Sequence, residues 1–349
     1  MLLLSEQDVE RLIDPAAAIA AVLKGFRQYS AGKLLAPGRL DMRRDDPKGS
    51  VLVLAGHTSD GLFACKNNAH VYPDAASRHR KAASLLTLWD MKACSPLALI
   101  ATTGFNNHRT AAGFAAAAQL LAPANSETLV IFGAGKIAPA AIRYLRHVRP
   151  IKRVLIVGRG PERATALADR VKVWPGFTDV SVEAMQDPAV AAAQADIIVT
   201  VTTSDTPVFP GAAVKPGAFV ILGGANRPEA READDNLIGR SAIFADHLDG
   251  CITRAGDIRL PLDAGTITRD QIIGEIGAVS SYPPTTGRLD VTVFKSMGVI
   301  AQDLALAKAL VDKAKAAQAG STFDLADGSF MRAKEMVFDT EDHSLEHAT

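Results

Sequence analysis

The chain has 349 residues, of which 48% are hydrophobic, and this is enough for two domains that each have a core. Lys plus Arg and Asp plus Glu both total 38, so no net charge recruits nucleic acid or an anionic membrane. Cys65, Cys94 and Cys251 have neither disulfide-framework nor zinc-site spacing, and the N-terminus has the pattern of neither a signal peptide nor a membrane span. We expect a cytoplasmic globular protein without a metal site.

Residues 1–122 mix helical and strand signals. Strands are predicted at "SVLVLAGH", "GLFACKNN" and "AASLLTLWD". Helices are predicted at "DPAAAIAAVLKGFRQYSAG" before them and at "GFNNHRTAAGFAAAAQLLA" after them. This order predicts an α+β unit.

Arg109 lies where the second of these helices is expected to begin, with Asn106 or Asn107 as its N-cap. A cation in the first turn meets the positive end of the helix dipole and is disfavoured there. Either Arg109 is solvated and tolerates a small cost, or it binds an anion beside the helix N-terminus. This stretch alone leaves both interpretations open.

From Ser126 onward, strands and helices alternate, which is typical of a parallel sheet. The predicted elements in order are "TLVIF", "APAAIRYLRHV", "RVLIV", "PERATALADRV", "ADIIVTVT", "AFVILGG" and "SAIFADH". The stretch from "VTVFKSMG" through "VIAQDLALAKALVDKAKAA" predicts a long helix that returns to the first unit. The terminal "FDTEDHSLEHAT" predicts a loose polar tail.

A glycine-rich turn joins the first of these strands to the first helix. Gly133, Gly135 and Ala138 form G-x-G-x-x-A, which permits a tight turn, close approach of a pyrophosphate and close packing of helix on strand. The alternative is a tight turn without a nucleotide. The context favours a Rossmann domain, with Ala134, Lys136 and Ile137 completing a loop whose backbone contacts the cofactor.

The end of the second strand does not decide between the two nicotinamide cofactors. NAD-binding proteins usually carry an acid there, whereas this chain has "VGRGPER". Arg159 can accept the 2′-phosphate of NADP or lie against the adenine. NADH and NADPH therefore both remain open.

Four blocks in order resemble the ornithine cyclodeaminase and mu-crystallin family. They are "FACKNNAHVYP", "FNNHRTAAGFAAAAQLLA", "VIFGAGKIA" and "VTVFKSMGVIAQDLALA". The resemblance implies that Arg109, followed by Thr110, lies in the active site near cofactor phosphate and substrate. It implies that Lys66 contacts the substrate carboxylate and helps proton transfer, and that Arg39 also binds this carboxylate. Without the resemblance, a lysine after an apolar strand such as Lys66 is more often a surface residue.

Further cofactor and substrate contacts follow from the Rossmann fold and the resemblance. Ligands of open α/β sheets lie across the carboxyl ends of the strands. This places four residues toward the dinucleotide, namely Thr202, Thr203, Gly223 and Gly224. The resemblance further implies that Lys295 and Ser296 lie near nicotinamide and substrate, the alternative being ordinary packing at a helix start.

One departure from the family bears on the reaction. Cyclodeaminases present an Asp in the loop where this chain has Asn226, and Ala230 replaces a typical basic residue. An amide is no general acid or base near neutral pH, so cyclodeamination of ornithine is disfavoured.

We therefore expect NAD(P)H-dependent reduction of a small 2-imino acid to the L-amino acid. The segment with His70, Arg78, His79, Arg80 and Lys81 is either a solvated basic loop or a second anion site. The second interpretation favours an imino dicarboxylate such as iminosuccinate, with the cyclic imine pyrroline-2-carboxylate next. The alternatives are an ornithine cyclodeaminase-type lyase and a non-catalytic binder of NADPH and a small ligand, as in mu-crystallin.

The expected architecture is an α/β chain in which a Rossmann domain is inserted into an α+β substrate and dimerisation domain. Residues 1–122 form the first part of the substrate domain and residues 123–305 the Rossmann domain. Residues 306–349 form a helix that returns to the first domain, followed by the tail. The resemblance implies a homodimer through the first domain.

Overall fold

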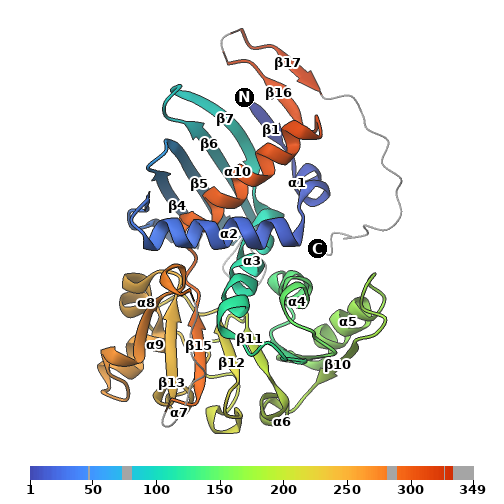
Figure 1. Ribbon diagram of the computed structural model, residues 1–349, viewed down its shortest axis with the longest axis vertical. Coiled ribbons are helices and arrows are strands. Elements are labelled where there is room, and N and C mark those ends of the chain that lie inside the picture. The colour runs from blue at the N-terminus through green and yellow to red at the C-terminus, as the bar shows by residue number, and fades with distance from the viewer. Residues whose placement is uncertain (46–47, 73–80, 281–288, 326, 333–349) are drawn as a thin grey trace.

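The computed structural model describes residues 1–45, 48–72, 81–280, 289–325 and 327–332. These residues form two bodies, one above the other in Figure 1. The chain passes from the upper to the lower body through α3 (Thr103–Leu121) and returns over residues 296–299 to α10 (Ile300–Ala316), which lies in the upper body. Within the described residues, no helix is both long and apolar enough to cross a membrane.

The upper body is built on a mixed sheet in the order β17-β16-β1-β7-β6-β5-β4-β2, with β3 paired to β4. Strand β1 runs parallel to β7, and the other described pairs are antiparallel. The strands are β1 (Leu2–Leu4), β2 (Leu34–Leu35), β3 (Leu40–Asp45), β4 (Lys48–Thr58), β5 (Leu62–Val71), β6 (Lys81–Asp90), β7 (Ser95–Ala101), β16 (Ser321–Phe323) and β17 (Phe330–Arg332).

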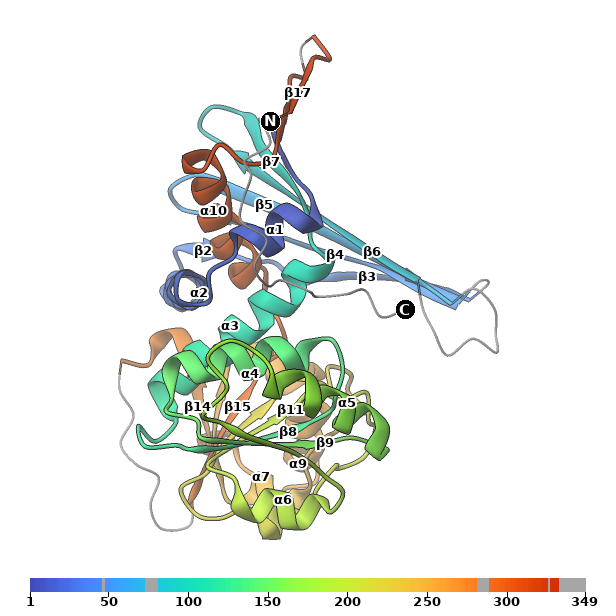
Figure 2. The same cartoon turned by 90° about the vertical axis from the view of Figure 1, so that its right-hand side faces the viewer.

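Helices cover one face of this sheet, and none of the described helices packs on the other, as Figure 2 shows. They are α1 (Glu6–Leu12), α2 (Pro15–Ser30), α3 and α10. The alternation of each strand follows this arrangement: Lys66 and Leu86 face the helices and are buried, whereas their neighbour Leu85 points the other way and is 47% exposed. The sheet therefore presents a core face, which includes Lys66, and an open face.

The lower body is an eight-stranded sheet in the order β10-β9-β8-β11-β12-β15-β13-β14, and all its described pairs are parallel. The strands are β8 (Thr128–Phe132), β9 (Arg153–Val157), β10 (Ser181–Met185), β11 (Ile197–Thr200), β12 (Phe219–Leu222), β13 (Ser241–Ala245), β14 (Ile272–Glu275) and β15 (Val291–Lys295). The order reverses at β8, which lies between β9 and β11. This is the doubly wound topology of a dinucleotide-binding domain, and it confirms the predicted fold class.

Helices pack against this parallel sheet. They are α4 (Ile137–Val148), α5 (Pro161–Lys172), α6 (Pro188–Gln194), α7 (Asp235–Gly239), α8 (Leu248–Arg254) and α9 (Gly256–Asp263). Three short 3₁₀ turns complete the described elements: η1 (Gly211–Ala213), η2 (Arg269–Gln271) and η3 (Ile276–Ala278).

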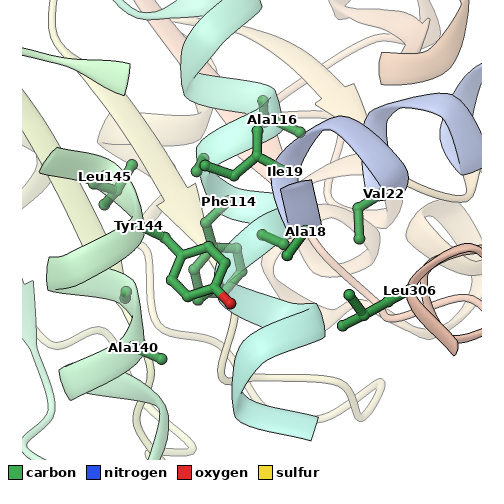
Figure 3. Close-up of a cluster of buried hydrophobic side chains, with 14 of the residues drawn as sticks. Ala18, Ile19, Val22, Phe114, Ala116, Ala140, Tyr144, Leu145 and Leu306 are labelled. Carbon is green, nitrogen blue, oxygen red and sulfur yellow. The ribbon is translucent and has the colours of Figure 1, made fainter. Parts of the chain in front are cut away.

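Helix α3 joins the cores of the two bodies. Figure 3 shows side chains of α2, α3, α4 and α10 in one cluster around Phe114 and Tyr144. Ala115–Ala118 of α3 are fully buried, and a Cβ on Gly113 would lie 2.4 Å from the Gln302 amide nitrogen. Small residues let neighbouring helices approach closely, so the alanine run serves packing between the bodies as well as helix propensity.

The predicted long helix near the C-terminus is wrong in its first part. Val291–Lys295 form strand β15, which is buried between β12 and β13, and the helix begins only at Ile300. Valine, threonine and phenylalanine fit a doubly covered strand. The chain therefore leaves the parallel sheet over residues 296–299, and the whole of α10 packs on α2 and the upper sheet.

Candidate active site

The turn between β8 and α4 has the geometry that the glycine pattern predicts. Gly133 has φ +109°, and a Cβ there would lie 2.7 Å from the carbonyl oxygen of Val201. No atom lies within 4 Å of a Cβ built on Gly135, which is exposed, whereas Ala138 is fully buried against the sheet. The turn thus leaves its backbone open to a pyrophosphate at the reversal point of the sheet.

The loop residues Ala134, Lys136 and Ile137 lead into α4, and Lys136 is exposed. Arg159 is also exposed, directly after β9 and two residues before α5 begins at Pro161. Both cations therefore lie beside loops that follow the carboxyl ends of β8 and β9, where a dinucleotide binds in this topology.

The strand ends at β11 and β12 are held together by a buried acid that the sequence patterns did not indicate. Glu232 accepts hydrogen bonds from the hydroxyls of Thr200 and Thr202, each at 2.7 Å, and from the amides of Thr202, Gly224 and Ala225. Thr203 is exposed beside this network.

Two glycines of this region have a packing explanation of their own. A Cβ on Gly223 would lie 2.4 Å from the Phe114 ring, and one on Gly224 would lie 2.4 Å from Glu232. Neither position therefore admits a side chain, whether or not a ligand lies nearby.

The start of α3 differs from the prediction. The helix begins at Thr103, so Arg109 lies in its second turn, and neither Asn106 nor Asn107 is the N-cap. The carboxylate of Glu6 accepts the amides of Thr103 and Gly104, both at 2.8 Å. An acid from α1 thus occupies these amides of the helix N-terminus, so they are not free for the anion that one of the two interpretations placed there.

Arg109 instead joins a cluster between α3, β5 and α10. Its Nη1 donates to Gln302 Oε1 at 2.8 Å, and its Nε lies 3.6 Å from Asp303 Oδ1. The same Oδ1 accepts a 2.8 Å hydrogen bond from Lys66 Nζ, which also donates to Asn106. The fold therefore brings Lys66 and Arg109 together around Asp303, which lies 237 residues from Lys66 in the chain. Thr110, the next residue of α3, is buried.

Several buried polar atoms of this cluster have no hydrogen-bond partner among the described residues. They are Arg109 Nε, Gln302 Nε2 and Asp303 Oδ2. Buried polar atoms are nearly always paired, so a group of unpaired ones indicates a site that a ligand or water completes.

Burial lowers the pKa of Lys66 to about 8. The carboxylate of Asp303 opposes this shift, and the nearby Arg109 guanidinium adds to it. A lysine with such a pKa can donate and accept a proton close to neutral pH.

Arg39 lies at a pocket between the two bodies. The pocket is lined by residues of both, including Arg39, Leu54, His247, Arg254, Gly298 and Ile300. Leu54 pairs with Lys66 across β4 and β5, and a Cβ on Gly298 would lie 2.8 Å from Arg109 Nη1, so the lysine cluster adjoins this pocket.

Arg39 Nη2 donates to the carbonyl oxygen of Asn226 at 3.5 Å, which brings these two predicted residues together. Burial lowers the pKa of Arg39, and Arg254 adds to the effect. The sequence patterns did not indicate Arg254, Gln302 or Asp303. A signal for Asp303 was present, because it is an acid among the apolar residues of "VIAQDLALA".

Lys295 and Ser296 lie at the end of β15 rather than at a helix start, and their side chains are buried. Lys295 Nζ donates to Asp257 at 2.7 Å and to the Ala225 carbonyl at 2.5 Å. Ser296 Oγ donates to Asp246 at 3.0 Å. No described hydrogen bond or ion pair of either side chain reaches Lys66 or Arg109.

The basic segment is described only in part. Arg78, His79 and Arg80 lie outside the described residues. His70 packs edge-on against Tyr72, with its Nδ1 3.3 Å from the Ser50 hydroxyl, and Lys81 is exposed at the start of β6.

Together, the doubly wound sheet, the open glycine turn and the cationic pocket at its carboxyl edge define a dinucleotide-binding protein of the Rossmann class. The sequence model of the ornithine cyclodeaminase/mu-crystallin family matches residues 1–318. The chain belongs to this family, as its four sequence blocks predict.

Known proteins similar to this chain include imine reductases. The Delta(1)-pyrroline-2-carboxylate reductase of Colwellia psychrerythraea is 33% identical over 253 residues, 71% of this chain and 79% of that protein. The Thermococcus litoralis reductase of the same name, solved with NADH and L-proline, has a TM-score of 0.84 at 26% identity and covers 92% of this chain and 99% of its own. The iminosuccinate reductase of Paracoccus denitrificans, solved with NAD⁺, has a TM-score of 0.81 at 26% identity, covering 91% and 97%.

Proposed function

We propose that this protein reduces a small 2-imino acid to the L-amino acid with NAD(P)H. The observation that carries the proposal is the buried Lys66 of lowered pKa, which adjoins a cationic pocket at the carboxyl edge of a Rossmann sheet. The names of the similar proteins support the same reaction class and a nicotinamide cofactor. NADH and NADPH remain alternatives, because Arg159 suits either one.

The residues present fit a dinucleotide. The backbone beside Gly133 and Gly135 is open for a pyrophosphate, and when bound the nicotinamide supplies the hydride that forms the new C–H bond at the imine carbon. Arg159, Thr203 and the loop residues 134–137 would hold the remainder of the cofactor.

Lys66 would supply or hold the proton on the substrate nitrogen. Two of its three N–H donors are directed to Asn106 and Asp303, which leaves one for the substrate. Asp303 also fixes the position of Lys66 and Arg109 through one shared oxygen. Arg39 and Arg109 would pair with the substrate carboxylate, which needs a cation once it loses its water.

The proposal admits more than one substrate, because Arg39 and Arg109 would bind the carboxylate that all 2-imino acids carry. Pyrroline-2-carboxylate appears in the names of two of the similar proteins and iminosuccinate in one. The sequence favours iminosuccinate through the segment 70–81, of which Arg78–Arg80 lie outside the described residues. Both substrates are 2-imino acids, and the proposal covers both.

Two other functions are less well supported. A cyclodeaminase-type lyase lacks its acid, because the loop carries Asn226, whose carbonyl is bonded to Arg39. A ligand-binding protein without catalysis leaves the lowered pKa of Lys66 without a role.

The test is the consumption of NADH and of NADPH by the purified protein with pyrroline-2-carboxylate, and with oxaloacetate, pyruvate, glyoxylate or 2-oxoglutarate plus ammonia. Formation of the matching L-amino acid supports the proposal. Cofactor binding without turnover of any of these compounds would favour the binding protein, and formation of proline from ornithine would favour the lyase.

We also propose that two copies pair through the open face of the upper sheet. Leu40, Met42, Val51 and Leu85 are exposed on that face, opposite the one that carries Lys66. Light scattering should report a homodimer that Leu85→Lys weakens; a monomeric wild-type protein would contradict this.

The three unpaired thiols support the predicted cytoplasmic location.

A further inference from the structure

The pocket between the two bodies is lined by a pair of cations of its own, and the cluster of Lys66 and Arg109 adjoins it. Arg39 enters it from the upper body and Arg254 from the end of α8 in the lower body. Both side chains are partly buried, and His247 lines the pocket with them. Two guanidinium groups that face one cavity repel each other unless an anion lies between them.

Within the described residues, the only carboxylate within 4 Å of any of these four cations is Asp303. It pairs with Lys66 and Arg109. In the described part of the chain neither Arg39 nor Arg254 has an ion-pair partner, and the more distant Asp41 carboxylate offsets part of the charge at Arg39. One substrate carboxylate would balance only part of this excess of positive charge. A second carboxylate would balance it further, at the end of the pocket that Asp303 does not reach.

The backbone that carries Arg254 is firmly placed. The next turn begins at Gly256, where a Cβ would lie 2.3 Å from the Ala230 carbonyl oxygen and 2.9 Å from that of Pro228. The amide of Gly256 also donates to the Arg227 carbonyl at 3.2 Å. The junction of α8 and α9 is thus packed against the loop that carries Asn226, which itself bonds Arg39.

We propose that Arg254 forms a second anion subsite beside Arg39, so that the preferred imino acid carries a carboxylate on its side chain as well as the one at C1, which Arg39 and Arg109 bind. This inference rests on the proposed function and narrows its substrate class to dicarboxylic imino acids. Arg254 is then a specificity-determining residue: a cyclic imine with one carboxylate gains nothing from it.

The test separates binding from turnover. Binding of L-aspartate and of L-alanine to the NAD⁺-saturated protein is measured by calorimetry for wild type, Arg254→Gln and a control, Arg259→Gln. Arg259 is a half-exposed arginine of α9 that pairs with Asp263. The same three proteins are assayed for reduction of oxaloacetate plus ammonia and of pyruvate plus ammonia.

We expect the wild type to bind L-aspartate more tightly than L-alanine, and Arg254→Gln to lose about tenfold to a hundredfold for L-aspartate only, since one charge-assisted hydrogen bond is lost. The control should match the wild type for both ligands. Equal affinity of the wild type for the two amino acids, or equal loss for both in Arg254→Gln, would overturn the subsite. Selective binding without turnover would contradict the proposed function and leave the subsite intact, whereas turnover indifferent to Arg254 would contradict only the subsite.

Discussion

Two buried lysine–aspartate pairs of nearly equal length lie in this molecule, and they differ in how completely their atoms are bonded. Lys66–Asp303 measures 2.8 Å and Lys295–Asp257 measures 2.7 Å. In the second pair, Asp257 also accepts the amides of Glu232 and Ala233, and Lys295 also donates to a carbonyl. In the first pair, Asp303 Oδ2 has no hydrogen-bond partner in the part of the chain that the structure describes.

The electrostatic environments differ in the same sense. Burial lowers the pKa of Lys66 to about 8, against the opposing effect of Asp303. Burial acts in the same direction on Lys295, but Asp257 and Glu232 outweigh it, and the pKa of Lys295 is raised. A buried ion pair is therefore no sign of a site by itself; unpaired atoms and a lysine able to titrate distinguish the one beside the pocket.

The largest expected effect is on catalysis. Lys66→Ala should reduce kcat for imine reduction by about 10²- to 10⁴-fold, the range of a lost general acid, and leave the affinity for NADH or NADPH nearly unchanged. Steady-state rates and a cofactor titration measure the two quantities. A variant with the wild-type rate would remove Lys66 from the mechanism.

The Lys295–Asp257 pair should matter for the stability of the fold. Lys295→Met leaves Asp257 buried without its counter-charge and should reduce the free energy of unfolding by about 3–5 kcal/mol. Lys66→Met should cost less, because Arg109 still lies beside Asp303. Urea unfolding of both variants makes the comparison, and an equal loss in the two would mean that the pairs do not differ as described.

The pH dependence sharpens the contrast. Protonated Lys66 is the donor, so kcat for reduction should fall as pH rises through about 8, whereas oxidation of the amino acid should rise over the same interval. Asp303 raises the pKa of Lys66, so Asp303→Asn should shift the fall in kcat for reduction to lower pH. If kcat fell at the same pH in the variant as in the wild type, Lys66 would not be the titrating group.

The smallest effect concerns the start of α3. Glu6→Ala removes the carboxylate that caps the amides of Thr103 and Gly104 and should cost about 1 kcal/mol of unfolding free energy without changing kcat. Thermal unfolding and a rate measurement suffice. A large loss of turnover would return the helix N-terminus to consideration as part of the site.

The sequence was sufficient wherever the signal was local. The glycines at 133 and 135 and the apolar strands around them predict the Rossmann domain, because turn geometry and strand burial depend on neighbouring residues. Lys66 was found only through the resemblance to a family, whereas Arg109 was singled out by its position near a helix start and received its active-site role from the resemblance. The residues that complete their surroundings, Asp303 and Arg254, come from distant parts of the chain, and no local pattern could place them beside the site.

The wrong predictions also arose from contacts between distant parts of the chain. The N-terminus of α3, which one interpretation assigned to an anion, is capped by Glu6, nearly a hundred residues earlier in the chain. The helix expected from Val291 begins at Ile300, because the preceding segment is recruited as a strand between β12 and β13. In both cases tertiary contacts override a local preference.

The most direct test of the central claim follows the hydride itself. In a single-turnover experiment, the protein is mixed with nicotinamide cofactor deuterated at the transferable C4 position and with pyrroline-2-carboxylate or an imino acid formed from one of the 2-oxo acids and ammonia. The product is analysed by mass spectrometry. The account predicts an L-amino acid with one deuterium at Cα, and none from Lys66→Ala on the same timescale. A product without deuterium, or no product while the cofactor stays bound, would contradict it.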